Sequence, residues 1–373
     1  MPNTGTNQVT LSFGNGALSA TARLQVAGHE LLMGHTPGAT QHTITLPKLP
    51  VGQHPLTIDG KETTATLEVY ASEMVIEFID VGQGDATLLI GPGGLTALVD
   101  VGPPGSGAQL LDLLARHQLT HLDMVILTHT DADHIGGVPE VMRGPDGLLG
   151  SADDLTVTTF YEDGSLTDRQ TQIAQEVKSV IDASSRSVVP VPGFKLEGLG
   201  GFAIEFIAVA GATKTQAASG DADANSNARS IVNQVCLDDW CGLLTGDITG
   251  GGLGTPDIET ILSQELAPMI WVKVPHHGSR SSSNSALAQT LQPRLAVFSL
   301  GDDNDHCHPA PETLSRWGQT ATLLSTGAGQ SGQGSCEATN WPAGSQPGCG
   351  SITLRKGADT LADLRCGDQT QKL

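Results

Sequence analysis

Potential metal ligands are concentrated in the segment HTDADH, residues 129–134. It directly follows the apolar run DMVILT, residues 123–128, which has the composition of a buried strand. Because alternate side chains of an extended segment share a face, we expect His129, Asp131 and Asp133 to converge. Imidazole and carboxylate groups together suit zinc, manganese or iron. The alternative is a solvated polar loop, but such loops rarely combine so many ligand types at a strand end.

Two further segments place potential ligands directly after predicted strands. Asp247 follows the apolar run GLLT, and His276 and His277 follow the run MIWVKV. Side chains at the carboxyl ends of strands assemble at one edge of an α/β sheet. Each pattern alone is weak, since an aspartate at a strand end is often a helix cap. Together with the 129–134 segment they predict a metal site.

The elements that would position these ligands begin near residue 74. Apolar strands such as MVIEFIDV and FAIEFIAVA alternate with helical segments such as AQLLDLLARHQL, which predicts α/β layers with helices covering sheets. SITLRK, residues 351–356, is the last predicted strand. Residues 1–72 contain only short β-rich runs and no helix-length periodic segment. We therefore expect a small immunoglobulin-like β-sandwich at 1–72, followed by a catalytic domain at 73–373.

Composition narrows the class of protein. The chain has 373 residues, with 19 Lys and Arg against 40 Asp and Glu, and 3% aromatic residues. Tight binding of long nucleic acids by phosphate neutralisation needs the opposite charge, and few aromatic residues are available for stacking on bases. No apolar run approaches the roughly 18 residues of a membrane span. The oligomeric state is left open.

The six cysteines favour an oxidising compartment. Cys236 and Cys241 bracket a short turn between two predicted strands, where a disulfide could close the hairpin. Cys336 and Cys349 bracket a Gly/Ser-rich loop and could pair locally, which would leave Cys307 and Cys366. We expect a secreted or periplasmic protein whose signal peptide has been removed. Six reduced thiols in a cytosolic protein are the alternative.

The order HTDADH, TGD (245–247) and PHHGS (275–279) resembles the metallo-β-lactamase fold, and in particular the hydrolase domain of ComEC competence proteins. The resemblance includes DVGQGDA (80–86), LVDVG (98–102) and NARS (227–230). Asn304 and His308-Pro309 also belong to it, and it covers about residues 74–357. It implies an αββα sandwich.

The resemblance also implies a site for two divalent metal ions, with zinc favoured and manganese possible. One ion would be bound by Asp133, His134 and His277, the other by His129 and Asp131, and Asp247 would bridge them. The usual family motif is HxHxDH, so Asp131 stands in place of its second histidine. The usual third histidine of the His129 site has no evident counterpart. Asn227 is near the expected place, but its amide oxygen is a weak ligand.

The expected chemistry is attack by a metal-activated hydroxide on phosphorus or on a carbonyl carbon. Asp133 is a predicted catalytic residue, and His308 and His276 are candidates for protonating the leaving group. For His308, a loop residue without a chemical role is an equal alternative. The predicted substrate-binding residues are Ser279, Arg280, Asn304 and Asn227. Asp80, Asp85 and Asp100 are expected to orient ligands and turns rather than bind metal.

The leading hypothesis is a metal-dependent phosphodiesterase, with a nuclease as its variant and a small anionic phosphoester as substrate. A hydrolase of lactones, β-lactams, other esters or phosphotriesters on the same site is the alternative. A cell-surface binding module with a structural metal is a third, although structural zinc sites are closed by four ligands. The acidic loop of Asp146, Asp153 and Asp154 could bind calcium, but a solvated loop is favoured.

Overall fold

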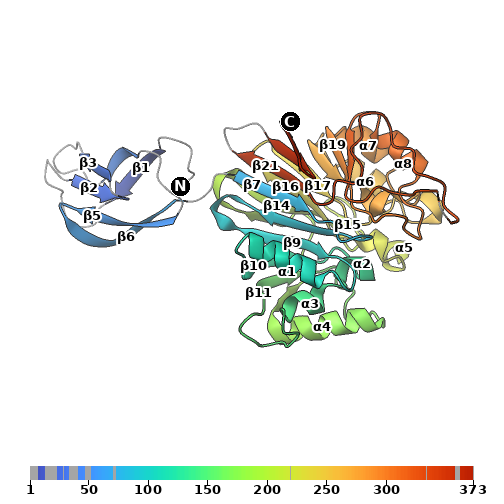
Figure 1. The fold of residues 1–373 in the computed structure, drawn as a ribbon, viewed down its shortest axis with the longest axis horizontal. Coiled ribbons are helices and arrows are strands. Elements are labelled where there is room, and N and C mark those ends of the chain that lie inside the picture. The colour runs from blue at the N-terminus through green and yellow to red at the C-terminus, as the bar shows by residue number, and fades with distance from the viewer. Residues whose placement is uncertain are drawn as a thin grey trace.

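The computed structural model describes residues 7–12, 23–27, 29–32, 41–46, 52–69, 73–218, 220–332, 334–357 and 362–372. From residue 73 onward two large β-sheets lie face to face, and helices cover their outer sides (Figure 1). This confirms the predicted α/β layers. Each sheet buries apolar side chains on both faces, so both its helices and the opposite sheet are needed to exclude water. None of the described helices is long and apolar enough to cross a membrane.

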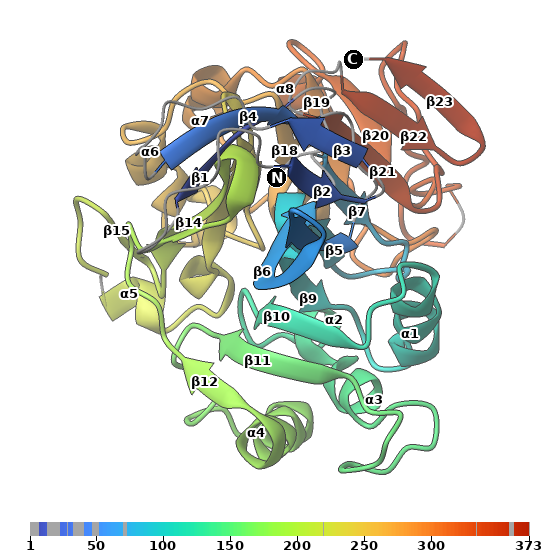
Figure 2. The same ribbon diagram turned by 90° about the vertical axis from the view of Figure 1, so that its left-hand side faces the viewer.

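The first sheet has the strand order β12-β11-β10-β9-β8-β7-β21-β22-β23. Figure 2 shows β9 to β12 side by side, with α4 beyond them. The strands β9, β10, β11 and β12 run parallel, as strands linked through helices do. The chain continues past the last predicted strand into a hairpin of β22 and β23, which sequence patterning missed because their residues are mostly polar. The bounds are β7 Glu73–Phe78, β8 Ala86–Ile90, β9 Thr96–Val101, β10 His121–Ile126, β11 Thr156–Tyr161, β12 Arg186–Val188, β21 Ile352–Gly357, β22 Asp363–Cys366 and β23 Gln369–Lys372.

The second sheet has the order β13-β14-β16-β17-β18-β19-β20, with β15 paired to β14. From β17 to β20 the strands are parallel, so their carboxyl ends share one edge. Its strands are β13 Lys195–Glu197, β14 Phe202–Val209, β15 Ala212–Thr213, β16 Val232–Leu237, β17 Trp240–Leu244, β18 Trp271–Lys273, β19 Leu295–Phe298 and β20 Thr322–Ser325.

Three apolar layers hold these elements together. Between the sheets, the buried rings of Phe78 and Trp271 meet edge to face with centroids 5.8 Å apart. Outside the first sheet lie α1 Gly107–Arg116, α3 Val138–Met142 and α4 Gln172–Ser184. Outside the second lie α6 Ile258–Ser263, α7 Ser285–Leu291 and α8 Pro311–Trp317. The short helices α2 Ala132–Ile135 and α5 Gly220–Asp223 lie near the loops at the strand ends.

The described residues before 70 form only β-strands. β1 Asn7–Ser12 pairs with β4 Gln41–Leu46. A second sheet has the order β3-β2-β5-β6, formed by β3 His29–Leu32, β2 Arg23–Val26, β5 Gly52–Ile58 and β6 Lys61–Val69. All of these pairings are antiparallel, as the predicted all-β segment requires. The immunoglobulin-like arrangement of 1–72, and its status as a separate domain, stay predictions.

The structure pairs all six cysteines. Cys236 and Cys241 face each other across β16 and β17 and are bonded, as predicted. The predicted local pair of Cys336 with Cys349 is wrong, because Cys336 is bonded to Cys307 and Cys349 to Cys366. The reason is strand register. Ile352 lies opposite Cys366 in the β21–β22 ladder, so the chain just before β21 brings Cys349 next to Cys366.

Peptide mapping without reductant, on protein produced in an oxidising compartment, should recover the pairs 236–241, 307–336 and 349–366. The long-range pairs are expected because they join segments that the sheets and loops already hold together. A linked peptide containing Cys336 and Cys349 would contradict the observed register.

Glu259 of α6 is a buried carboxyl group outside the strand-end region. Its two oxygens accept the backbone N–H groups of Ser283 (2.6 Å) and Asn284 (2.5 Å). Gly250 lies so close that a Cβ there would come within 2.3 Å of the Glu259 carboxylate. Burial raises the pKa of Glu259 from 4.5 to about 8, although the two N–H donors act in the opposite direction. The side chain therefore ties α6 to the start of α7 in its protonated form near neutral pH.

Unfolding should release a proton from Glu259 between its unfolded pKa of 4.5 and its folded pKa of about 8. The free energy of unfolding should consequently fall as the pH rises through this window, by at most about 1.4 kcal/mol per pH unit. In Glu259→Gln the contribution to this slope should disappear, with an overall loss of about 1–2 kcal/mol because one N–H donor then faces an amide NH₂ group. Urea unfolding from pH 5 to 8 measures this, with the exposed Glu197→Gln as control. An unchanged slope in Glu259→Gln would contradict the assignment.

Candidate metal centre

The predicted ligands come together where strands of both sheets end. His129 follows β10 of the first sheet, whereas Asp247 follows β17 and His277 follows β18 of the second. All three side chains are buried, with 1–2% of their surface exposed. The centre therefore exists only when both sheets are packed against each other.

The 129–134 segment does not stay extended, which corrects the expected alternation of its side chains. Asp131 occupies the N-cap position of α2, and Asp133 and His134 lie inside that helix. The helical turn directs Asp133 Oδ2 to within 3.2 Å of His277 Nε2 and 3.9 Å of His134 Nε2. Asp133 thus approaches His277 and His134 through a turn of helix, whereas Asp131 lies 3.6 Å from His129.

One oxygen, Asp247 Oδ2, lies at the middle of the cluster. It is 3.3 Å from His134 Nε2, 3.4 Å from His277 Nε2 and 3.6 Å from His276 Nε2. Ligand atoms of His134, Asp247, His277 and Asp85 all lie within 4.8 Å of one another. This spacing is compact enough for one ion to be shared among them.

The buried atoms of the cluster lack hydrogen-bond partners on the side that faces inward. The Nδ1 atoms of His134 and His277 lie 2.7 Å from Asp100 Oδ2 and from the Ser299 carbonyl oxygen, respectively. Their Nε2 atoms make no hydrogen bond, and neither does Nε2 of His129. An unpaired buried nitrogen is costly unless a ligand satisfies it. A divalent cation fits this donor set, since an acceptor behind each imidazole is the usual support of metal-bound histidine.

The charges around the cluster attract a cation. Burial disfavours a charged imidazole, but the carboxylates of Asp247, Asp100 and Asp133 raise the pKa of His134 well above its ordinary value. Burial likewise disfavours a charged carboxylate, yet His277 and His134 hold the pKa of Asp247 well below its usual range. Positive charge is thus stabilised at the point where the unpaired nitrogen and oxygen atoms meet.

The second group of predicted ligands is looser. His129 Nε2 lies 3.6 Å from Asp131 Oδ2, and its Nδ1 is 3.1 Å from the Thr128 hydroxyl. Asn227, near the expected place of a third ligand, has its amide nitrogen 3.4 Å from both ring nitrogens of His276. The structure therefore places Asn227 beside His276.

The side chains of the PHHGS segment depend on an unusual backbone. His276 and His277 both have φ of 50°, in the left-handed region. For residues other than glycine this costs about 1–2 kcal/mol each. The conformation lets two neighbouring residues both face Asp247, and the Ser281 hydroxyl 2.9 Å from His276 Nδ1 holds the first ring. Strain of this kind is a mark of functional sites.

The predicted substrate-binding residues differ in their burial and in their contacts. Ser279 is buried two residues after His277, and the His308 ring lies 5.6 Å from that of His276. Arg280 is exposed and pairs with Glu312 at 3.2 Å. Asn304 is buried within its own loop, where its amide donates to the carbonyl groups of Gly301 and His308. It supports the loop that carries His308.

The sequence analysis assigned no role to Lys273, and it expected Asp85 to orient ligands and turns rather than to bind metal. In the structure the buried Lys273 ammonium pairs with Asp85, donates to the Gly246 carbonyl group at 3.1 Å and lies 3.5 Å from Asp247 Oδ1. Its positive charge thereby offsets the negative charges of Asp85 and Asp247. The available signal was a lysine inside the otherwise apolar strand MIWVKV. A charged residue in such a strand is seldom buried without a partner.

The acidic loop also brings its carboxylates together. Oxygens of Asp146, Asp153 and Asp154 lie within 4.8 Å of one another, near the surface. They accept hydrogen bonds from their own loop, including Gly150 N to Asp154 Oδ2 at 2.5 Å. The carboxylates therefore cap N–H groups of the turn to which they belong.

Asp100 supports His134 from behind and should control metal affinity. Asp100→Asn should keep the fold, because asparagine tolerates the positive φ of 58° at this position. Without the charge behind His134, affinity for Zn²⁺ should fall about 10- to 100-fold. Competition with a chromogenic chelator measures this. Asp80→Asn, in a nearby turn, is the matched control and should keep wild-type affinity. Equal affinities in the two variants would contradict the role of Asp100.

Part of the chain is similar to a known protein family and to one curated protein. Residues 79–211 match the sequence profile of the Metallo-beta-lactamase superfamily. ComE operon protein 3 of Bacillus subtilis (strain 168) is 24% identical over 262 residues, which make up 65% of this chain and 30% of that protein. The chain therefore spans less than a third of the length of this relative.

Several solved structures are similar over two thirds of the chain. A diphosphatase of the PhnP family shares 15% identity and covers 67% of this chain and 94% of its own, with a TM-score of 0.40. Zn²⁺-bound PqqB from Methylobacterium extorquens shares 12% sequence identity, and the similarity covers 65% of this chain and 85% of PqqB, with a TM-score of 0.41. The short form of human tRNase Z shares 13% sequence identity, and the similarity covers 68% of this chain and 92% of that protein, with a TM-score of 0.35.

The superfamily match includes the HTDADH segment together with Asp85 and Asp100, and it ends before Asp247 and His277. Those two later residues join the matched ones in a single buried cluster. Residues 79–211 therefore match the metallo-beta-lactamase superfamily, and the chain resembles ComE operon protein 3 over the part that they share.

Proposed function

We propose that this protein is a metal-dependent hydrolase that cleaves small phosphodiesters. The observation that carries the proposal is the convergence of unpaired, buried imidazole nitrogens on one oxygen of Asp247. A closed structural zinc site would use four protein ligands and leave no room for substrate. Here an exposed rim of Arg280 and His306 adjoins the centre instead.

The residues that would hold two divalent ions are those of the cluster. Asp133, His134 and His277 would hold one ion, His129 and Asp131 the other, and Asp247 would contact both. When bound, such ions supply positive charge to the reacting phosphoryl group and lower the pKa of a bound water. An oxygen-rich set of three carboxylates accommodates Mn²⁺ as well as Zn²⁺.

The chain's own side chains would position the substrate beside the ions. Burial lowers the pKa of His276 to about 4 and that of His308 to about 3, so both imidazoles are neutral near pH 7. A neutral imidazole can donate one hydrogen bond to a phosphoryl oxygen or to the leaving oxygen. Hydrolysis adds a water oxygen to phosphorus, breaks one P–O ester bond and delivers a proton to the departing alkoxide. In this proposal His308 and His276 would donate hydrogen bonds to the departing oxygen while water supplies the proton.

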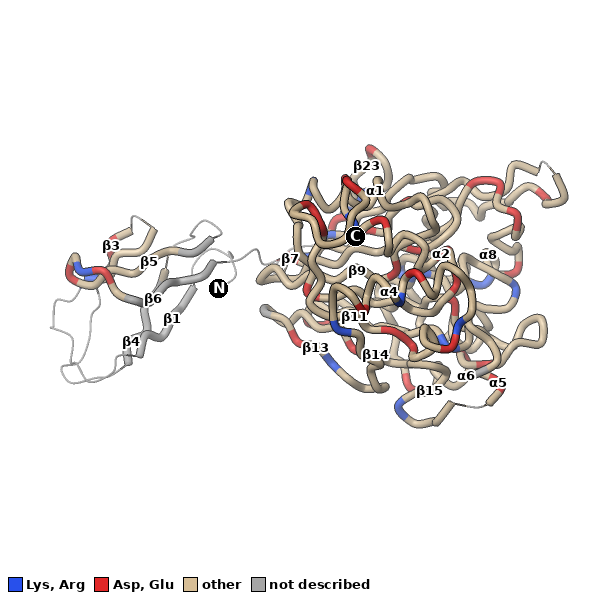
Figure 3. The backbone as a smooth tube through the Cα atoms, turned by 90° about the horizontal axis from the view of Figure 1, so that it is seen from below, with Lys and Arg blue, Asp and Glu red and all other residues tan. Residues whose placement is uncertain are grey.

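The charge of the protein favours small substrates over long nucleic acids. The chain carries 40 acidic and 19 basic residues, and Asp and Glu are the more frequent on the face shown in Figure 3. An acidic surface repels a chain of phosphates and cannot gain from releasing its counterions. A single phosphodiester has one charge and needs only the local field of the centre.

Asp247→Ala should lower the hydrolysis of bis(p-nitrophenyl) phosphate at least about 10³-fold, because it removes the central carboxylate. His277→Ala should act nearly as strongly by removing one buried nitrogen donor. Both are measured as kcat/KM with added Zn²⁺ or Mn²⁺, together with the bound metal per chain.

The exposed Asp112→Ala on α1 is the matched control and should keep wild-type kinetics. Circular dichroism of Asp247→Ala should match the wild type if the loss is chemical. Wild-type turnover in Asp247→Ala would exclude the proposed centre as the site of reaction.

A substrate panel separates the proposed activity from its alternatives. It contains bis(p-nitrophenyl) phosphate, a phosphotriester, single-stranded and duplex DNA, a lactone and a chromogenic β-lactam. We expect the small diester to react fastest and DNA to be cleaved slowly, because the acidic surface repels it. Lactone or β-lactam hydrolysis about tenfold faster than that of the diester, roughly 1.4 kcal/mol in barrier, would favour carbonyl chemistry instead.

A further inference from the structure

A cavity of about 510 Å³ is lined by His308, a neighbour of the candidate metal centre. His308 lines the cavity, and its ring lies 6.4 Å from that of the cluster residue His277 and 5.7 Å from that of His306. Ser279 and Arg280, which follow the histidine pair after Gly278, line it as well. A substrate bound at the centre could therefore extend into this cavity past His308.

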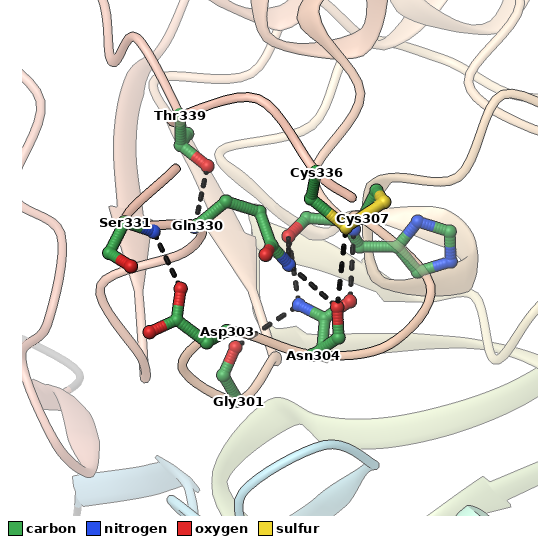
Figure 4. The surroundings of a disulfide bond; sticks show 9 residues. Gly301, Asp303, Asn304, Cys307, Gln330, Ser331, Cys336 and Thr339 are labelled. Carbon is green, nitrogen blue, oxygen red and sulfur yellow. Dashed lines mark hydrogen bonds between the residues drawn. A yellow bond between two sulfur atoms is a disulfide. The ribbon is translucent and has the colours of Figure 1, made fainter. Parts of the chain in front are cut away.

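One wall of the cavity comes from the loop insertion before β21, and it is fixed in place (Figure 4). The Cys307–Cys336 disulfide joins this insertion to the loop that carries His308. The buried Gln330 donates through Nε2 to the Asn304 carbonyl group at 2.8 Å, and Thr339 Oγ1 accepts the Gln330 N–H at 2.8 Å. Because the disulfide and the hydrogen bonds already hold this wall in place, binding of a ligand costs little conformational entropy.

The lining combines hydrogen-bonding groups with an apolar floor. Arg280, His306, Glu337, Thr339 and Asn340 supply donors and acceptors, and Pro311 and Leu314 supply apolar surface. The exposed pair of Arg280 with Glu312 contributes little stability, so the guanidinium can turn to a ligand. None of the described lining residues is Phe, Tyr or Trp, so the planar groups that the lining offers are the rings of His306 and His308 and the Arg280 guanidinium.

These properties identify the class of group that would fit. Hydroxyl groups on a saturated ring need alternating donors and acceptors, while the C–H faces of that ring pack against apolar side chains. We infer that this cavity, named here the 307–336 pocket, binds a sugar or polyol arm of the phosphodiester. The inference rests on the proposed function, because it assumes that the phosphoryl group lies at the metal centre.

The test compares phosphodiesters that share a p-nitrophenolate leaving group but differ in the other arm. The second arm is methyl, glucose attached through O6, or thymidine attached through O5′. With metal-loaded protein, kcat/KM for the glucose ester should exceed that for the methyl ester about tenfold or more. Equal values for methyl and glucose, or a higher value for thymidine than for glucose, would overturn the inference.

Variants of the pocket locate the effect. Glu337→Ala and Asn340→Ala should each reduce the glucose-to-methyl ratio about five- to twentyfold, because each removes hydrogen-bonding groups. Glu197→Ala, an exposed acid on β13 at the opposite edge of the second sheet, is the matched control and should keep the ratio. An unchanged ratio in both pocket variants would overturn the inference.

The disulfides supply a second matched pair. The double variant Cys307→Ser/Cys336→Ser should raise KM for the glucose ester, because the wall is no longer tied. Cys236→Ser/Cys241→Ser, which opens the β16–β17 hairpin, should leave that KM unchanged. Melting curves for both variants show whether each remains folded. Equal effects of the two double variants would overturn the role of the wall.

Calorimetry separates failure of the pocket from failure of the proposed function. Glucose 6-phosphate should bind metal-loaded protein about tenfold more tightly than methyl phosphate, and Glu337→Ala should remove the difference. If this difference holds while no diester is hydrolysed, the pocket stands and the phosphodiesterase proposal fails. If diesters are hydrolysed but the two phosphates bind equally, the pocket inference fails alone.

Discussion

The buried carboxylate of Asp247 is the point on which the rest of the centre depends. Three imidazoles, two from the segment after β18 and one from α2, direct a nitrogen at its Oδ2. Such a concentration of polar groups in a desolvated place is stable only if every charge is balanced. Lys273 supplies part of that balance on the other oxygen, and Asp100 supplies it behind His134. The remaining unpaired atoms define what a cation would satisfy.

This arrangement explains several features of the backbone that would otherwise be costly. His276 and His277 occupy the left-handed region so that two consecutive side chains can face the same carboxylate. The next residue, Gly278, approaches Pro309 and Phe298 so closely that a Cβ would come within 3.0 Å of both. The residue that follows the histidine pair is therefore in close contact with the loop that carries His308. Packing around one site holds local strain that the segment alone would relax.

The loop insertion before β21 acts on the same centre from outside. It contributes no predicted ligand, yet its disulfide and the hydrogen bonds of Gln330 tie it to the loop that carries His308. Under the proposed function, this would link the oxidation state of Cys307 and Cys336 to the geometry of the loop that carries His308. A fold of two sheets shared by many enzymes can differ in substrate through such additions, because loops at strand ends vary without disturbing the core.

The sequence by itself determined the α/β layers and indicated a metal site. Strong apolar runs predicted β7, β10, β14 and β18, and the ligand types that follow the runs ending β10, β17 and β18 predicted the site, since both signals are local. The tertiary structure alone decided how these residues are used. It showed α2 beginning at Ala132, Lys273 and Asp85 in the cluster, and Cys349 paired with Cys366. Each of these follows from contacts between segments distant in the chain. Side-chain direction and cross-strand register depend on how the two sheets pack, which no local pattern records.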